Sequence, residues 1–280
     1  MKEDEYDLLI ESPTEFLANV WMPRISPNLA KIGESNTFRN NMAWLKGGIA
    51  MMALLWACGQ AVEQLKTECG TVSAIGGILK APFDILADKL RGFRQVSIDV
   101  HRQPDKVEAA CEALMPHLLQ NAKVTADPTK QVPVTVWLHR APCFLKNMYE
   151  RFFWPTMKEL IIKLWEDGLQ TLVYAEGNWD KWLKYTEELP EKSIVYHVDK
   201  GDIFEVHKKI GDKFCLSGGV PNDMLAYGSP EEVKEYTKKL IETVGKDGGY
   251  VVDAAAILQD DAKVENVKAI TDAVLEYGEY

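Results

Sequence analysis

The sequence predicts an α/β fold of the TIM-type (β/α)8 barrel. Short apolar segments alternate with amphipathic helical segments from residue 71 onward, which is the pattern of parallel strands joined by crossover helices. Several of these segments are unbroken apolar runs such as residues 171–174, as expected for a parallel sheet that is covered on both faces. The helix after the fifth such run has a clear start, with Ser229 as N-cap and Pro230 at the first helical position.

We expect one domain over residues 1–280, with a helical N-terminal segment over 1–70 and the βα units over 71–280. In the first part, residues 5–32 and 40–68 are predicted to be helical. About six strands are recognisable after Thr71, whereas a closed barrel needs eight. The predicted strands cover residues 72–79, 132–138, 169–174, 193–198, 213–216 and 249–252, and the predicted helices between and after them cover 82–91, 104–122, 145–167, 179–189, 203–210, 230–246 and 265–277.

Composition narrows the function classes. The net charge is -10 and no basic cluster stands out, which argues against a nucleic-acid partner. The five cysteines have no CxxC spacing, so a reducing cytoplasm is the expected location. The acidic N-terminus lacks the layout of a signal peptide. The apolar run from Gly47 to Cys58 is shorter than the ~18 residues of a membrane span, and we interpret it as a buried core helix with no membrane partner.

Three polar residues stand at the ends of three successive predicted strands. They are His139, Glu176 and His197. Because the carboxyl ends of barrel strands line the active-site face, and neighbouring strands lie only ~4.8 Å apart, these side chains are candidate catalytic residues. Each also has an ordinary explanation, since His197 could be a hydrogen-bonded core residue and Glu176 a solvated loop acid.

Other residues near the strand ends are candidates for substrate binding. Trp179 could line an apolar pocket or simply pack a helix on the barrel. Gly218 could allow a ligand to approach the backbone or could make a turn, and Asn222 lies just beyond it. Asp199, two residues after His197, can point to the same side of a strand as that histidine. The set His197, Asp199 and Glu176 therefore forms a candidate metal site.

Six short blocks in order resemble the uroporphyrinogen decarboxylase superfamily, which includes the decarboxylase and corrinoid-dependent methyltransferases. They span nearly the whole chain. The blocks are Ala81-Pro82-Phe83, Leu138-His139, Phe153-Trp154-Pro155-Thr156, Tyr174-Ala175-Glu176-Gly177, His197-Val198-Asp199 and Glu265-Asn266-Val267-Lys268-Ala269. The resemblance implies a barrel whose first part, roughly two βα units, precedes the region matching Met1. The chain is then expected to be a fragment, or a short form with an open barrel or one completed by another chain, which favours a homodimer.

The resemblance also implies two chemistries. The decarboxylase has a catalytic Tyr where Asp88 stands here and a His in the turn occupied by residues 253–256, so porphyrinogen decarboxylation is disfavoured. The methyltransferase branch holds zinc with His-x-Cys and a distant Cys. Here His197-Val198-Asp199 replaces the first pair and the distant Cys is absent, so zinc would rely on Glu176, His139 or Cys143, an arrangement suited to a methyl ether or alcohol.

The leading hypothesis is a cytoplasmic methyltransferase that moves a methyl group between a small methylated substrate and a corrinoid held by a separate protein. His139, Glu176 and His197 would be its catalytic residues and zinc its metal. One alternative is a decarboxylase of uroporphyrinogen or another carboxylated substrate. The other is a non-catalytic truncated barrel that acts as a binding subunit.

Overall fold

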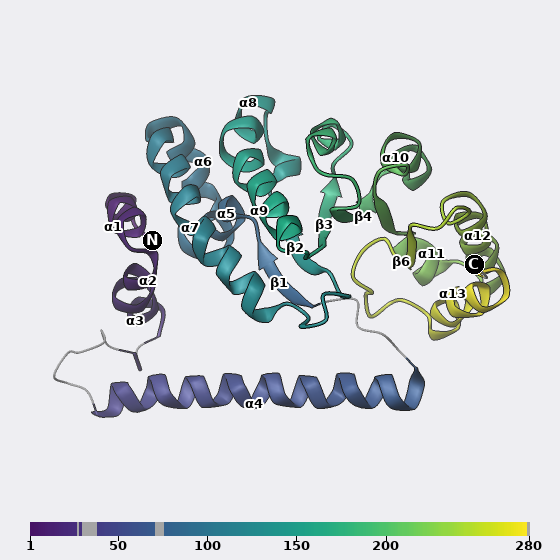
Figure 1. The fold of residues 1–280 in the computed structure, drawn as a ribbon, viewed down its shortest axis with the longest axis horizontal. Helices are drawn as coiled ribbons and strands as arrows, with labels where there is room; N and C mark the ends of the chain where they lie inside the picture. Colours follow the sequence, from purple (N-terminus) through teal and green to yellow (C-terminus); the bar gives the residue numbers. More distant parts are fainter. Residues whose placement is uncertain (27, 30–37, 71–75, 279–280) are drawn as a thin grey trace. The chain divides into compact units, whose positions relative to one another are not determined.

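The computed structural model describes residues 1–26, 28–29, 38–70 and 76–278. It contains one sheet of six parallel strands in the sequential order β1-β2-β3-β4-β5-β6 (Figure 1). The strands are β1 (Gly77–Lys80), β2 (Val134–Leu138), β3 (Thr171–Asn178), β4 (Ile194–Lys200), β5 (Cys215–Val220) and β6 (Tyr250–Ala254). This is the arrangement of an incomplete (β/α)8 barrel, and the predicted fold class is confirmed. Residues 72–75 of the first predicted strand lie outside the described residues.

The chain divides into two compact units. One consists of residues 1–74 and 85–117, and the other of residues 75–84 and 118–280. The division of the chain at residue 70 into a helical segment and barrel units stays a prediction. The helices before β2 are η1 (Glu3–Glu5), α1 (Tyr6–Glu11), α2 (Pro13–Phe16), η2 (Leu17–Trp21), α3 (Met22–Ile25), α4 (Phe38–Cys69), α5 (Pro82–Ile85), η3 (Leu86–Leu90), α6 (Phe93–Arg102) and α7 (Pro104–Thr125), where η marks a 3₁₀ or π turn.

Helices alternate with the strands along the second unit. They are η4 (Ala141–Cys143), α8 (Lys146–Met148), η5 (Tyr149–Phe153), α9 (Trp154–Glu166), η6 (Leu183–Glu188), α10 (Ile203–Ile210), α11 (Asn222–Tyr227), α12 (Pro230–Thr243) and α13 (Val264–Tyr277). The predicted cap of α12 is present, since the Ser229 hydroxyl accepts the amide of Glu232 and the Glu232 carboxylate accepts the amide of Ser229. The predicted helix over 179–189 is a shorter 3₁₀ helix, η6.

The two faces of the sheet differ. Helix α9 packs on β3, and α12 packs on β5 and β6 (Figure 1). On this face, Val173 and Tyr196 line a small cavity together with Met157 and Ile161 of α9. Alternate residues point to the opposite face, which we call the inner face. There the side chain of Tyr174 stacks on that of His197, with ring centroids 4.1 Å apart.

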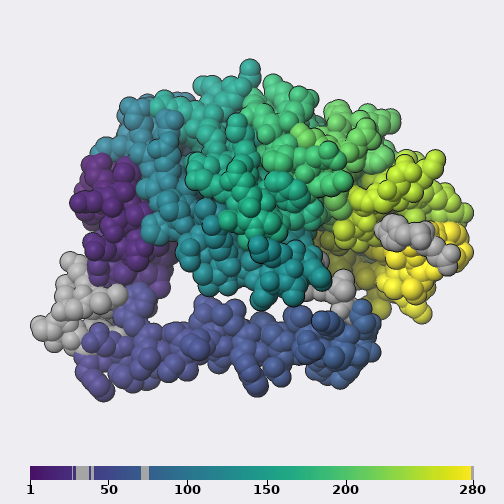
Figure 2. Space-filling model, viewed as in Figure 1, coloured from purple at the N-terminus to yellow at the C-terminus, as the bar shows by residue number. Residues whose placement is uncertain are grey.

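Helix α4 differs from its prediction. The run from Gly47 to Cys58 was expected to be buried, but no residue of the apolar window in Asn41–Cys69 is buried, and Figure 2 shows α4 side chains on the surface along the helix. The segment is apolar on all sides, with a mean hydropathy of 1.4 in that window, so no single face is marked for burial. By length and composition alone α4 could cross a membrane, which is not sufficient evidence that it does.

Candidate active site

A chain of three polar side chains lies at the carboxyl ends of β1, β2 and β3, on the inner face of the sheet. Lys80 ends β1, His139 follows the last residue of β2, and Glu176 lies near the end of β3. The Lys80 Nζ atom is 2.9 Å from His139 Nδ1, and His139 Nε2 is 3.3 Å from Glu176 Oε2. The structure therefore brings two of the three predicted catalytic residues together and adds Lys80 to them.

The Lys80 Nζ atom lies near both ring nitrogens of His139, 2.9 Å from Nδ1 and 3.2 Å from Nε2, and we assign the tautomer from the shorter of these contacts and from Glu176. A lysine ammonium can only donate, so the nearer nitrogen, Nδ1, accepts from Lys80. An ionised carboxylate can only accept, so Nε2 carries the proton and faces Glu176. The side chains of His139 and Glu176 are 26% and 54% exposed, so both are accessible from solvent.

Carboxylates continue this row along the sheet. Ala175 of β3, Val198 of β4 and Val252 of β6 lie in one register row across the sheet. The next residues along these three strands are Glu176, Asp199 and Asp253. Burial raises the pKa of Tyr174 to about 12, and the charges of Asp199, Asp253 and Glu176 add to the effect. The three carboxylates thus act on one tyrosine, and they lie with the ammonium group of Lys80 at the carboxyl ends of the strands.

His197 occupies a different environment from His139. It lies within β4 and is only 1% exposed. Its Nε2 lies 3.0 Å from the carbonyl oxygen of Ala255, so Nε2 carries the proton, and its Nδ1 lies 3.2 Å from the Ser217 hydroxyl. Burial lowers the pKa of His197, although the nearby Asp253 acts in the opposite direction. The ring is therefore neutral with both nitrogens occupied, as in a structural histidine.

These contacts decide how well zinc fits. Both nitrogens of His197 are in use, and Asp199 Oδ2 accepts the backbone amide of Gly177 at 2.6 Å. No group of three His, Cys, Asp or Glu side chains with metal-binding geometry occurs among the residues that the structure describes. The predicted grouping of His197, Asp199 and Glu176 around zinc is not present, and we derive no chemistry from a metal.

The predicted substrate-binding residues have structural contacts. Trp179 is 5% exposed and donates its indole N–H to the carbonyl of Glu176 at 2.9 Å, which ties the backbone at Glu176 to the turn that follows. Gly218 has φ +90°, and a Cβ there would lie 2.7 Å from the carbonyl of Val198. The side chain of Asn222 accepts the backbone amide of Ala256 and donates to the backbone carbonyl of Ile257.

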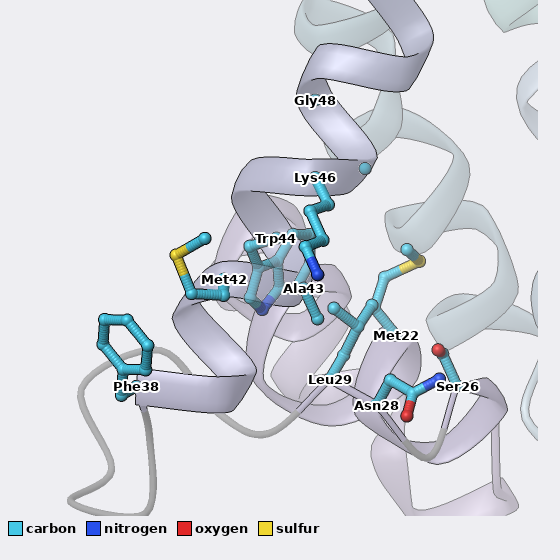
Figure 3. Close-up of a pocket in the computed structure, with 11 residues that line it drawn as sticks. Met22, Ser26, Asn28, Leu29, Phe38, Met42, Ala43, Trp44, Lys46 and Gly48 are labelled. Carbon is cyan, nitrogen blue, oxygen red and sulfur yellow. The ribbon is translucent and has the colours of Figure 1, made fainter.

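A separate cavity of about 980 Å³ lies beside α4 (Figure 3). The described residues that line it are largely apolar and include Met22, Phe38, Met42 and Trp44. Lys46 is the charged residue of this lining. The described lining has no acid–base pair comparable with Lys80, His139 and Glu176. We therefore place the candidate active site at the end of the sheet.

Comparison with known proteins identifies the family. Residues 53–277 match the sequence profile of the family described as Uroporphyrinogen decarboxylase (URO-D). The chain belongs to the URO-D family. This confirms the superfamily that the six sequence blocks predicted. The match begins inside α4 and ends at the last residue of α13, so it includes every strand of the sheet and the whole candidate active site.

Individual relatives are more distant. The chain is 29% identical to the uroporphyrinogen decarboxylase of Methylococcus capsulatus over 76 residues, which are 27% of this chain and 21% of the relative. It is 30% identical to that of Actinobacillus succinogenes, also over 76 residues, 27% of this chain and 21% of the relative. The aligned part thus spans about a fifth of these curated relatives.

A solved structure supports the fold. A methyltransferase from Methanosarcina mazei superposes with a TM-score of 0.63 at 18% identity, covering 78% of this chain and 63% of that protein. At this level of identity the likeness concerns the fold. It agrees with the incomplete (β/α)8 barrel that the sheet shows.

Two residues of the site were not predicted from the sequence. Lys80 ends a short strand directly before the Ala81-Pro82-Phe83 block, and Asp84 follows that block. The Lys80 position could have been noticed because it is a charged residue at a strand end, as His139 and Glu176 are. Asp84 gave no comparable signal, since an acid in the first turn of a helix is common.

Proposed function

We propose that this URO-D family chain is an enzyme that transfers a methyl group between a small methylated substrate and a corrinoid held by a separate protein. The observation that carries the proposal is the chain of polar contacts that joins Lys80, His139 and Glu176 at the strand ends. The corrinoid of the partner would supply the methyl acceptor or donor. The residues of this chain would bind the substrate and transfer its protons.

The proton requirement is specific. When a methyl group leaves the oxygen, nitrogen or sulfur atom of a neutral donor, that atom keeps the electron pair of the broken bond and needs a proton, whereas a cationic donor leaves as a neutral product. In the assigned tautomer His139 Nε2 carries a proton, and Lys80 can return a proton to Nδ1 as that proton leaves. His139 would therefore act as general acid with Lys80 behind it. In the reverse direction the same atoms would remove the proton from the methyl acceptor.

The charge of the site favours a neutral or cationic substrate. Glu176, Asp199 and Asp253 all act on Tyr174, and these three carboxylates outnumber the single ammonium group of Lys80 beside them. A substrate with several carboxylates would meet repulsion there, since like charges at short range raise the energy of a complex. This supports a small methylated compound over a polycarboxylate tetrapyrrole.

The test is a methyl-transfer assay with the full chain. Cob(I)alamin is mixed with the protein and a panel of methylated amines, methyl ethers and thioethers, and methylcobalamin is followed by its absorbance. His139→Gln should reduce the rate about 10²- to 10⁴-fold, because general acid catalysis contributes about that much. The matched control is His101→Gln, at an exposed position of α6, which should retain the wild-type rate. Wild-type protein that is inactive with every donor, or His139→Gln with an unchanged rate, would overturn the proposal.

Decarboxylation is the second candidate. The curated relatives are named uroporphyrinogen decarboxylases, and a carbanion left by loss of carbon dioxide also needs a proton, which His139 could supply. Release of carbon dioxide from uroporphyrinogen, together with no methyl transfer, would favour this candidate. The predicted cytoplasmic location and homodimer stay predictions under either activity.

A further inference from the structure

A buried carboxyl group holds the backbone at the end of β2. Asp84 is 0% exposed. Its Oδ2 accepts the amide N–H of His139 at 2.9 Å, and its Oδ1 accepts the amide N–H of Arg140 at 3.2 Å. One side chain thus binds two successive amides, one of which belongs to the central residue of the candidate active site.

The local backbone explains why one carboxyl group reaches both amides. Successive N–H groups of an extended strand point in opposite directions, so a continuing strand could not offer both to the same group. The ladder between β2 and β3 ends at the pair Leu138 and Ala175, and Arg140 has a helical conformation with φ -99° and ψ -20°. The chain turns directly after His139, and the turn brings both amides towards Asp84.

These hydrogen bonds replace those of the sheet. The amides of His139 and Arg140 lie beyond the last ladder pair, and a buried N–H without an acceptor is strongly unfavourable. A hydrogen bond from an amide to a carboxylate is stronger than one to a carbonyl. The turn at the end of β2 is therefore stabilised by a side chain of α5, the short helix that follows the neighbouring strand β1.

The direction of the His139 side chain depends on this turn. The ring is only partly buried, with 26% of the side chain exposed, so packing alone leaves it room to move. Lys80, which binds Nδ1, is the last residue of β1 and lies four residues before Asp84 of α5. The segment from the end of β1 into α5 therefore supplies one partner for the ring and one anchor for its backbone.

We propose that Asp84 is a positioning residue for His139. It fixes the backbone at His139 and Arg140 so that the ring lies between Lys80 and Glu176 with its Nε2–H directed into the site. The catalytic significance of this role depends on the proposed methyl transfer. The effect on the ring does not, because it concerns only the geometry of His139.

The variant Asp84→Asn tests this role. Asparagine has nearly the same size but replaces one acceptor oxygen by an NH₂ group, which would face one of the two amide donors. The control is Asp202→Asn, because the carboxyl group of Asp202 also accepts a backbone amide, that of Phe204 at 2.9 Å, but caps α10. If Asp84→Asn does not fold, Asp84→Thr takes its place, since its hydroxyl can accept one amide.

The first measurement is the ¹⁵N NMR spectrum of the histidine rings in the full chain, at a pH where imidazole is neutral. In the wild type, His139 should show two well separated ring nitrogen signals, those of a single tautomer protonated at Nε2. In Asp84→Asn these two signals should move closer together, as a freed ring samples both tautomers, while the signals of the buried His197 stay unchanged. Asp202→Asn should give the wild-type spectrum. Unchanged His139 signals in a folded Asp84 variant would overturn the proposal.

The second measurement uses the methyl-transfer assay. Asp84→Asn should reduce kcat by about 10- to 100-fold, because a small displacement of a catalytic group has an effect of that size, while KM changes less than about twofold. An unchanged kcat alongside altered ring signals would mean that the position of His139 does not limit the reaction. Absence of turnover in the wild type would refute the proposed function and leave the NMR result to decide the role of Asp84.

Discussion

His197 shows how burial sets the protonation state of a single residue. Its ring is 1% exposed, and burial lowers its pKa from the ordinary value of 6.5. Below about pH 6.5 the unfolded chain therefore takes up a proton at this position while the folded chain does not. Since stability falls wherever the unfolded state binds more protons, the contribution of neutral His197 is complete above about pH 6.5 and is lost as the pH falls towards the lowered pKa.

We expect a measurable pH dependence from this one group. The free energy of unfolding should decrease by up to about 1.4 kcal/mol per pH unit below pH 6.5, the slope for one proton. Urea unfolding at pH 7.5 and pH 5.5 measures it. His197→Gln should be less stable than the wild type at pH 7.5 and should lose this part of the pH dependence. His101→Gln, an exposed control, should change neither value, and an equal pH dependence in His197→Gln and wild type would contradict the prediction.

His139 and His197 look alike in the sequence because each ends an apolar run. The register separates them. His197 pairs with Tyr174 and Ser217 inside the ladder, whereas His139 follows Leu138, the last paired residue of β2. The predicted strand over 193–198 ended one residue after His197, but β4 continues to Lys200. Pairing on both sides within the ladder therefore separates the structural His197 from His139, which lies one residue beyond the ladder.

At the scale of elements, α4 is the clearest departure from the sequence prediction. Apolar composition predicted burial, yet large side chains along the helix are exposed, including Leu54 at 57% and Trp56 at 70%. The helix pattern itself was predicted correctly over residues 40–68. Composition indicates that a segment prefers an apolar environment, but whether other residues cover it depends on contacts that the local sequence does not record.

The exposure of α4 leads to a prediction about stability. Leu54→Glu should change the free energy of unfolding by no more than about 0.5 kcal/mol, as for other surface substitutions. Leu160→Ala, in α9, is the comparison, because Leu160 is 0% exposed and its truncation should cost about 2 to 5 kcal/mol. Urea unfolding of both variants measures the difference. A loss above about 2 kcal/mol for Leu54→Glu would mean that α4 is buried in solution.

Across the whole molecule, the sheet has two unpaired edges in the part of the chain that the structure describes. β1 pairs only with β2, and β6 only with β5. Exposed strand edges with apolar side chains promote association, and Ile78 in β1 is 58% exposed while Val251 in β6 is 46% exposed. The homodimer expected from the strand count stays a prediction, and we expect its contact at these two strand edges.

We expect the chain to associate through these edges. Sedimentation velocity at increasing concentration should show species larger than the monomer. Ile78→Lys and Val251→Lys together should shift the distribution to monomer, because lysine on an edge strand opposes pairing, while Ile78→Val should behave as wild type. Association that is equal in the lysine variant and the wild type would place the contact elsewhere.

The sequence by itself determined the order of the six strands and of the longer helices, though not the presence of α6 and α11, together with the superfamily and the positions of His139 and Glu176 at strand ends. These features follow from local rules of periodicity, capping and turn chemistry, which act within a few residues. The tertiary structure decided that Lys80 and Asp84 meet His139, that His197 is enclosed between Ser217 and Ala255, and that α4 is exposed. Such contacts join residues far apart in the chain, and they depend on strand register and packing, which are set only when the whole sheet assembles.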